Sequence, residues 1–130
     1  MARTVAYQGG KYRIEYACVN NGTSPGLDFF DGLSKIDQAK LSALFKMAGE
    51  GNFHNKEKFG DLGDGLFEFK SFQIRMPYSY RKRDRAVIVV THGFIKKRDK
   101  TPKEEIARAK RILEEDQASS GLVLVKGAKR

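Results

Sequence analysis

The first half of the chain changes from a period-two pattern of apolar residues to a helical one. Apolar and polar residues alternate over Tyr12–Val19, which predicts a half-buried strand. Ser24-Pro25 supplies an N-cap and a first-turn proline for a short helix. That helix is expected to bury three apolar side chains, Phe29, Phe30 and Leu33. Apolar residues at helical spacing over Lys35–Ala48 predict a second helix directly after it.

The second half of the chain returns to a period of two. Asn52–Gly65 is interpreted as a long loop, and alternation begins at Leu66. Within Phe72–Tyr80 every even position is apolar or aromatic, which predicts an antiparallel strand that is buried on one side. Pro77 cannot donate to a sheet ladder, so we expect this strand at an edge or with a bulge. Ala86–Thr91 is more continuously apolar and should lie in the middle of the sheet.

A helix closes this pattern. Thr101 with Glu104 three residues later forms a capping box, and Pro102 suits the first helical turn. The helix is expected to reach about Asp116, with a buried stripe of Ile106, Ala109 and Leu113. Residues 117–130 could be an extra strand, a partner-binding arm or a disordered tail.

Length and cysteine content favour one domain in a reducing compartment. The 130 residues can bury a core without disulfides or metal, so we expect a single domain, 1–130, with its core over about 12–116. The one cysteine, Cys18, is interpreted as a small buried thiol. Ala86–Val90 is the longest apolar run, and the N-terminus lacks the apolar core of a signal peptide. A cytoplasmic location without a membrane partner is therefore expected.

The net charge of +9 is confined to one quarter of the sequence. Lys70–Lys103 holds eleven Lys and Arg residues and two acids, Asp84 and Asp99, while the rest of the chain is balanced. Clustered positive charge gains affinity for a polyanion by releasing condensed counterions. RNA or DNA is therefore the partner that the composition favours. The alternative is a solvated basic face that only keeps the protein soluble.

The polar residues of this segment suit phosphate chemistry. No His or Cys falls at a zinc-ligand spacing, so no metal or cofactor is expected. When RNA is cleaved by its own 2′-hydroxyl, one group takes a proton, cations stabilise the charge on phosphorus, and a donor protonates the leaving 5′-oxygen. A lysine among other cations can be neutral often enough to act as the base, and the planar fork of an arginine can clamp the phosphate. The candidate groups are Lys70, Arg75, Tyr78, Tyr80, His92, Lys96, Lys97, Arg98 and Lys100.

Several of these residues also have a structural interpretation. His92 could be an acid or base, or a hydrogen-bonded histidine at the rim of the core. Tyr78 and Tyr80 could stack on bases, although their alternation with apolar residues favours the core. Arg75 could be a phosphate ligand or a solvated charge on the polar face of its strand. The basic turn Arg81–Arg85 could be functional or simply exposed.

Short motifs in a fixed order resemble those of one protein family. The motifs are Leu66–Lys70, Ile74–Met76, Val87–Gly93 and Phe94–Ile106 with Ala109. Over about Gly26–Asp116 the chain resembles the RelE/HigB toxin superfamily, in particular its phage-derived HigB-like branch. This resemblance implies the α+β class, with a RelE-like β-α-α-β-β-β-α order. It also implies a small, mostly antiparallel twisted sheet with the helices packed on one face.

The resemblance also implies an activity and partners. Such a protein is the toxin of a type II toxin–antitoxin system, a metal-independent endoribonuclease that cleaves mRNA on the translating ribosome and is neutralised by a helix-turn-helix antitoxin. Lys70 is similar to the basic residue of the first central strand, Arg75 to the phosphate-clamping arginine, and Lys97 or Arg98 to the basic residue of the loop before the last helix. Two positions depart from the pattern: Glu68 replaces a second basic residue, and Lys100–Pro102 holds no base-stacking tyrosine.

These considerations give two sets of candidate residues. The catalytic set is Lys70, Arg75, His92, Lys97 and Arg98. The RNA-binding set is Lys56, Lys58, Arg81, Lys82, Arg83, Lys96 and Lys100. The leading hypothesis is the ribosome-dependent toxin. Its rivals are a noncatalytic nucleic-acid-binding phage protein that uses the same cations, and an interaction subunit whose basic face binds an acidic partner.

Overall fold

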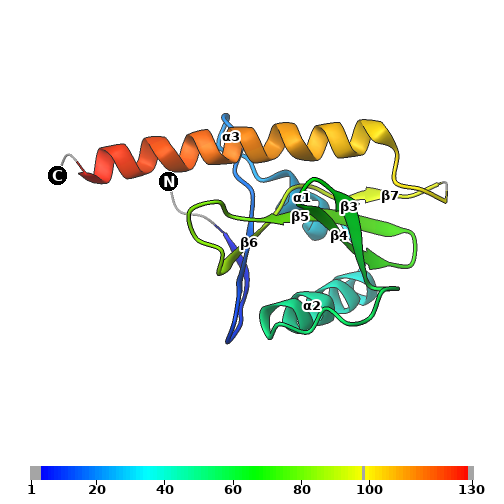
Figure 1. Ribbon diagram of the computed structural model, residues 1–130. Helices are drawn as coiled ribbons and strands as arrows, with labels where there is room; N and C mark the ends of the chain where they lie inside the picture. Colours follow the sequence, from blue (N-terminus) through cyan, green and yellow to red (C-terminus); the bar gives the residue numbers. More distant parts are fainter. Residues whose placement is uncertain (1–3, 98, 129–130) are drawn as a thin grey trace.

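A computed structural model describes residues 4–97 and 99–128 of the chain, with side chains as far as residue 118 (Figure 1). Its helices and strands follow in chain order: β1 (Val5–Gln8), β2 (Arg13–Tyr16), α1 (Pro25–Asp31), α2 (Lys35–Gly49), β3 (Phe59–Gly63), β4 (Leu66–Ser71), β5 (Ile74–Tyr80), β6 (Val87–Val90), β7 (Phe94–Ile95) and α3 (Lys103–Ala128).

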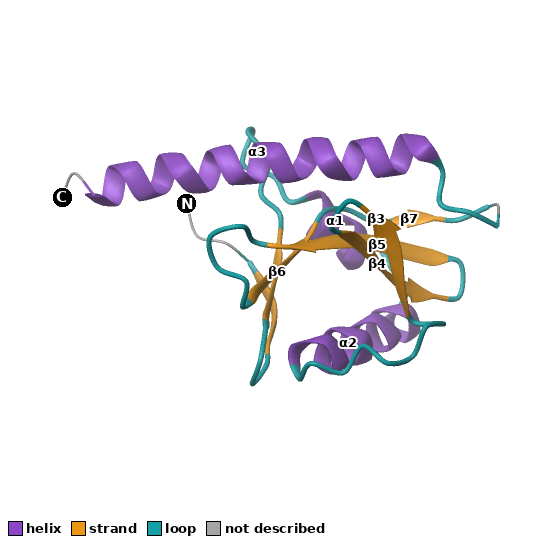
Figure 2. Ribbon diagram, viewed as in Figure 1, coloured by secondary structure: helices purple, strands orange, loops and turns teal. Residues whose placement is uncertain are grey.

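The strands form one mixed, twisted sheet in the order β1-β2-β6-β5-β4-β3, with β7 also paired to β5 (Figure 2). The β2–β6 pairing is parallel, and the other pairings are antiparallel. The expected α+β class and mostly antiparallel sheet are confirmed. β6 lies between β2 and β5, which confirms the mid-sheet position predicted from its apolar run.

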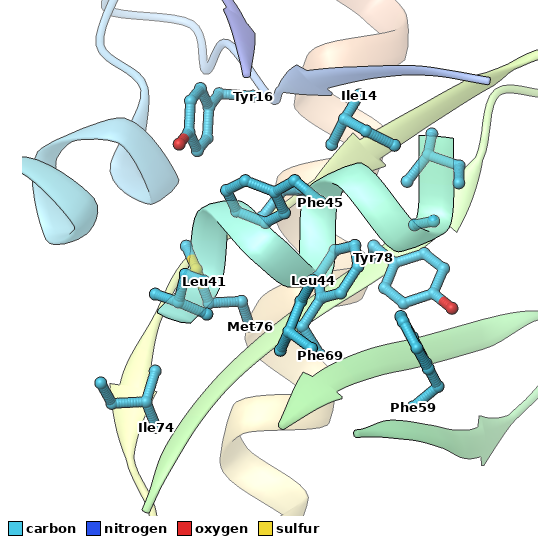
Figure 3. Packing of buried hydrophobic residues seen from close by; sticks show 13 residues of the cluster. Ile14, Tyr16, Leu41, Leu44, Phe45, Phe59, Phe69, Ile74, Met76 and Tyr78 are labelled. Atoms are coloured by element: carbon cyan, nitrogen blue, oxygen red, sulfur yellow. The ribbon is translucent and has the colours of Figure 1, made fainter. Parts of the chain in front are cut away.

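The main core lies between the sheet and the two helices α1 and α2. On β5 the side chains of Ile74, Met76 and Tyr78 point into it, as their alternation predicts. α2 contributes Leu41 and Phe45 from the opposite side. Figure 3 shows these side chains interdigitating with further residues of the cluster, which include Ile14, Tyr16, Leu44, Phe59 and Phe69.

The other face of the sheet is covered by α3. Val87 and Val89 of β6 pack with Ile112 and Leu113 of α3, whereas Ile88 and Val90 join the main core. α3 and α2 accordingly lie on opposite sides of the sheet (Figure 1). The expectation that all helices share one face is wrong. A central strand that is apolar at every position can bury both of its faces, and this requires a helix on each side.

Most helix and strand positions agree with the sequence pattern. The strand predicted at Tyr12–Val19 appears as β2, and the two predicted helices appear as α1 and α2. Ser24 stands at the N-cap of α1 without a side-chain bond, whereas the Ser34 hydroxyl caps α2 by accepting from the Asp37 N–H at 3.2 Å. Cys18 is buried, as predicted.

The segment Asn52–Gly65 is not only a loop, because β3 forms within it. Gly60, Asp61 and Gly63 are poor strand formers, so local propensity does not predict a strand at these positions. The strand exists because its backbone pairs with β4, with Phe59 opposite Phe69. Nonlocal pairing thus overrides propensity here.

Pro77 lies inside the sheet, so the expected edge position is wrong. Antiparallel ladders alternate between bonded and non-bonded pairs, and the proline nitrogen faces the side of β6 and β7. There the Thr91 backbone N–H donates to the Pro77 carbonyl at 2.9 Å, and the Thr91 hydroxyl oxygen lies 3.2 Å from the same carbonyl oxygen. The register on β5 shifts by one residue between β6 and β7, so the bulge lies on this neighbouring segment, at His92-Gly93.

The last helix begins where predicted but is held differently and runs further. The Thr101 hydroxyl donates to Glu68 of β4 at 2.8 Å, and the Pro102 carbonyl accepts from the Ile106 N–H. The predicted capping role of Thr101 is therefore replaced by a bond to the sheet. α3 continues to Ala128, so the backbone over 117–128 is helical rather than a strand or a disordered tail.

A buried ion network ties the sheet to the middle of α3. Glu15 and Asp116 are almost fully buried, and the Arg81 guanidinium bridges them, 2.8 Å from Glu15 Oε1 and 3.2 Å from Asp116 Oδ2. Arg13 also pairs with Glu15, at 2.8 Å. Asp116 Oδ1 accepts from the Cys18 N–H at 2.9 Å. Buried carboxylates need such partners, because removing one partner leaves charge stranded in a low dielectric.

Replacing Arg81 by methionine should therefore destabilise the fold by about 2–4 kcal/mol. The matched control is Arg83→Met, because Arg83 is exposed in the same loop and should change stability by about 0.5 kcal/mol or less. Urea denaturation of both variants measures the difference. Equal effects of the two substitutions would contradict a structural role for Arg81.

Candidate nucleic-acid interface

Basic residues form a line across three neighbouring strands. Lys70 of β4 stands directly opposite Arg75 of β5. On its other side, the Lys70 N–H donates to the carbonyl of Lys58 at 2.8 Å, one residue before β3 begins. Residues directly opposite one another share a face of the sheet. The three side chains therefore start from one line on the face opposite α2.

The segment after β7 continues this line. Phe94 of β7 pairs with Arg75, and the Lys96 N–H donates to the carbonyl of Gln73 at 2.6 Å. Lys97 follows and is exposed. We call Lys58, Lys70, Arg75, Lys96 and Lys97 the basic end of the sheet. The topology thus brings together cations that are far apart in the sequence.

The cations of the basic end differ in what they offer to a ligand. Lys58 and Lys97 are exposed and Lys70 is half-buried, and none of the three has a carboxylate within ion-pair distance among the described residues. Lys96 is half-buried, and its Nζ donates to the Asp99 carbonyl at 2.9 Å. Arg98 lies outside the described residues.

Arg75 does not face solvent. It is 7% exposed, and its Nη1 donates to the carbonyls of Phe72 at 2.6 Å and Ile74 at 2.9 Å. Its Nε is buried and has no hydrogen-bond partner among the described residues. The two sequence-based interpretations of Arg75, a phosphate ligand and a solvated surface charge, both need an accessible guanidinium. The burial of Arg75 contradicts that premise. Because β7 pairs against this position, Arg75 braces the β4–β5 turn instead of presenting its fork outward.

His92 is buried and takes part in an interaction between the sheet and α3. Its Nε2 lies 3.0 Å from Glu105 Oε1, and its Nδ1 lies 2.9 Å from the Thr91 hydroxyl. A carboxylate only accepts, so Nε2 carries the proton and Nδ1 of the neutral ring accepts from Thr91. Burial lowers the pKa of His92, and the positive charge of Arg108 lowers it further, while Glu105 opposes both effects.

A catalytic role for His92 conflicts with this burial, because only 1% of the residue is exposed. The structure matches the other interpretation, a hydrogen-bonded histidine at the rim of the core. The bulge at His92-Gly93 breaks the alternation of β6 and lets the ring meet Glu105 of α3. Tyr78 is buried and Tyr80 is half-buried in the aromatic core, so both face inward, as the alternation favours.

Glu68 is a residue of this region whose role the sequence did not reveal. It is 6% exposed, shares a face with Lys70 two residues later, and accepts from Thr101 at the start of α3. Across the β3–β4 ladder stands Gly60, which leaves room for the Glu68 side chain. An open hollow of about 480 Å³ beside this contact is lined by Lys100, Thr101, Pro102, Lys103 and Glu104.

The remaining predicted RNA-binding residues separate into two groups. Lys56 and Lys100 are exposed in the loops that lead into β3 and α3. Arg81, Lys82 and Arg83 lie at the opposite end of β5, about 20 Å from Arg75 at the usual rise per strand residue. The guanidinium of Arg81 is paired with Glu15 and Asp116, which gives it a structural role, while Lys82 and Arg83 are exposed. The basic segment thus forms two separate clusters rather than one.

The fold and this surface define a small α+β domain that is consistent with a RelE-like fold. Residues 28–114 match the family model described as phage-derived protein Gp49-like (DUF891), and the chain therefore belongs to this family. The family is associated with RelE/HigB-like toxins, which supports a toxin-like class. The search of curated proteins found no match. Within the described part of the chain, no helix combines the length and apolarity needed to cross a membrane.

The depressed pKa of His92 predicts a pH-dependent stability. The unfolded chain takes up this proton near pH 6.5, whereas the folded protein does so only at lower pH. The free energy of unfolding should therefore fall as the pH drops below 6.5, and His92→Gln should flatten that fall. Urea denaturation over a pH series measures both. The same pH slope in wild type and variant would contradict a buried neutral His92.

Proposed function

We propose that the protein is the toxin of a type II toxin–antitoxin system in the HigB-like branch of the RelE/HigB superfamily. In this proposal it cleaves mRNA on the translating ribosome, and a helix-turn-helix antitoxin neutralises it. The family match gives the toxin-like class. The observation that carries the nuclease proposal is the basic end, where Lys58, Lys70 and Lys97 lie on neighbouring segments and have no carboxylate partners among the described residues.

The chemistry that suits these groups is attack by the RNA's own 2′-hydroxyl. The 2′-oxygen forms a bond to phosphorus as the bond to the 5′-oxygen breaks, which leaves a cyclic phosphate and a free 5′-hydroxyl. In our proposal a neutral lysine amine takes the 2′ proton, and a lysine ammonium gives one to the 5′-oxygen. Lys70 and Lys97 are assigned to these two steps, and Lys58 stabilises the added negative charge. No metal or cofactor takes part in either step.

Two buried residues act on this site by positioning it. Arg75 holds the β4–β5 turn through the Phe72 and Ile74 carbonyls, which fixes the strand that pairs with Lys70. Glu68 holds Thr101, and with it the loop that carries Lys96 and Lys97. Rigid supports of this kind keep catalytic groups within the small tolerances that catalysis needs.

A noncatalytic nucleic-acid-binding protein is the second candidate. It is favoured by the burial of His92 and by the internal hydrogen bonds of Arg75, which leave lysines as the accessible groups of the basic end. Such a protein would bind RNA with a steep salt dependence and leave transcripts intact in a translating extract. Cleavage of translated mRNA therefore separates the two candidates.

Induction of the wild-type protein should stop growth and cut ribosome-bound transcripts, and Lys70→Ala with Lys97→Ala should relieve both effects. The expected loss of cleavage is on the order of 100-fold or more, because both groups assigned to proton transfer are removed together. Primer extension on translated mRNA measures the cuts, and thermal denaturation confirms that the variant is folded.

The control removes the same charge elsewhere. Lys11 and Lys46 are exposed near the C-terminal end of α2, away from the basic end, so Lys11→Ala with Lys46→Ala should remain toxic. Intact translated transcripts in cells arrested by the wild type would refute the nuclease proposal. Equal loss of toxicity in both double variants would refute the assignment to the basic end.

A further inference from the structure

Phe72 is a solvent-exposed aromatic residue at the tip of the β4–β5 hairpin. It is 76% exposed, more than any other large hydrophobic residue of the described chain. It occupies the first position of the two-residue turn between Ser71 and Ile74, with φ at +54°. This left-handed region is unfavourable for a bulky side chain, and hairpin turns of this kind normally use Asn, Asp or Gly.

Hydrogen bonds hold the backbone of this turn at both of its central residues. Arg75 Nη1 donates to the Phe72 carbonyl at 2.6 Å, and the next carbonyl, that of Gln73, accepts from the Lys96 N–H at 2.6 Å. Both ends of the turn are thus bonded to the basic end of the sheet. A buried arginine thus fixes the backbone of an exposed phenylalanine. Packing of the core does not explain this arrangement, because the Phe72 side chain is outside the core.

A cation lies over the ring. Lys40 Nζ, from α2, stands 4.2 Å from the centroid of Phe72, which is the geometry of a cation–π contact. The exposed ring therefore has a positive charge over one face, and the backbone of the turn that carries it is bonded to the basic end. Sites for single-stranded nucleic acid combine these two features, a positively charged groove for the backbone and aromatic rings on which bases stack.

We propose that Phe72 is a base-stacking platform, on which a nucleobase of bound single-stranded RNA rests while its phosphates contact Lys96 and Lys97. This inference rests on the proposed RNA-binding function and adds a subsite to it. Because any base has a π face, the platform would hold the strand in place without strong sequence preference. The adjacent cations favour RNA over an apolar protein partner as its occupant.

The test uses the absence of tryptophan from the natural sequence. Phe72→Trp makes a single-tryptophan protein with an aromatic ring at the same place. A short mixed-sequence RNA should quench the fluorescence of this tryptophan, and the same oligomer with abasic riboses should not. Phe72→Leu, which keeps an apolar side chain but removes the ring, should bind the RNA about 5- to 100-fold more weakly. Its affinity for the abasic oligomer should equal that of wild type.

A stability measurement separates this role from a structural one. Phe72→Gly relieves the left-handed conformation, so the melting temperature should rise by about 3–6 °C while RNA binding weakens as in Phe72→Leu. RNA binding by Phe72→Trp without quenching would overturn the platform and leave the proposed function standing. Wild-type protein that fails to bind RNA would overturn both proposals. Base-dependent quenching without cleavage on ribosomes would support the platform and reject the nuclease.

Discussion

The register of the β4–β5 hairpin is the constraint on which the rest of the structure depends. Its two-residue turn, Phe72-Gln73, places Lys70 opposite Arg75 and Phe69 opposite Met76. Because side chains alternate between faces, a slip of one residue would move Ile74, Met76 and Tyr78 out of the main core. The same slip would turn Lys70 toward α2. Folding of the core and assembly of the basic end therefore require one and the same pairing.

The placement of α3 depends on polar contacts as much as on apolar ones. Near its start Thr101 donates to Glu68, one turn later Glu105 bonds His92, and at mid-length Asp116 pairs with Arg81. Apolar packing against the sheet centres on Ile112 and Leu113. Directional contacts fix a helix along its axis more sharply than a small apolar patch does. They also fix the loop before α3, and with it Lys96 and Lys97.

The parts of this fold that a sequence can predict are those that local periodicity encodes. The alternation of Ile74, Met76 and Tyr78 predicted their burial, and the helical spacing over Lys35–Ala48 predicted α2. The burial of Arg75 could not be predicted, because it depends on pairing with β7, and the bulge at His92-Gly93 misleads any argument from alternation. Arg81 looked like a surface charge because its partner Glu15 is 66 residues away. The basic residues are also clustered in the sequence, but the fold separates them into two groups at opposite ends of β5, which the sequence alone does not show.

The central claim is that RNA is bound at the end of the sheet that carries Lys58, Lys70 and Lys97, beside the tip of the β4–β5 hairpin. Titration of isotopically labelled protein with single-stranded RNA, followed by amide chemical shifts, tests it most directly. The account predicts shifts at these three residues and at Phe72-Gln73, with little change over Lys82–Arg85 at the far end of β5. Shifts confined to Lys82–Arg85 would contradict it.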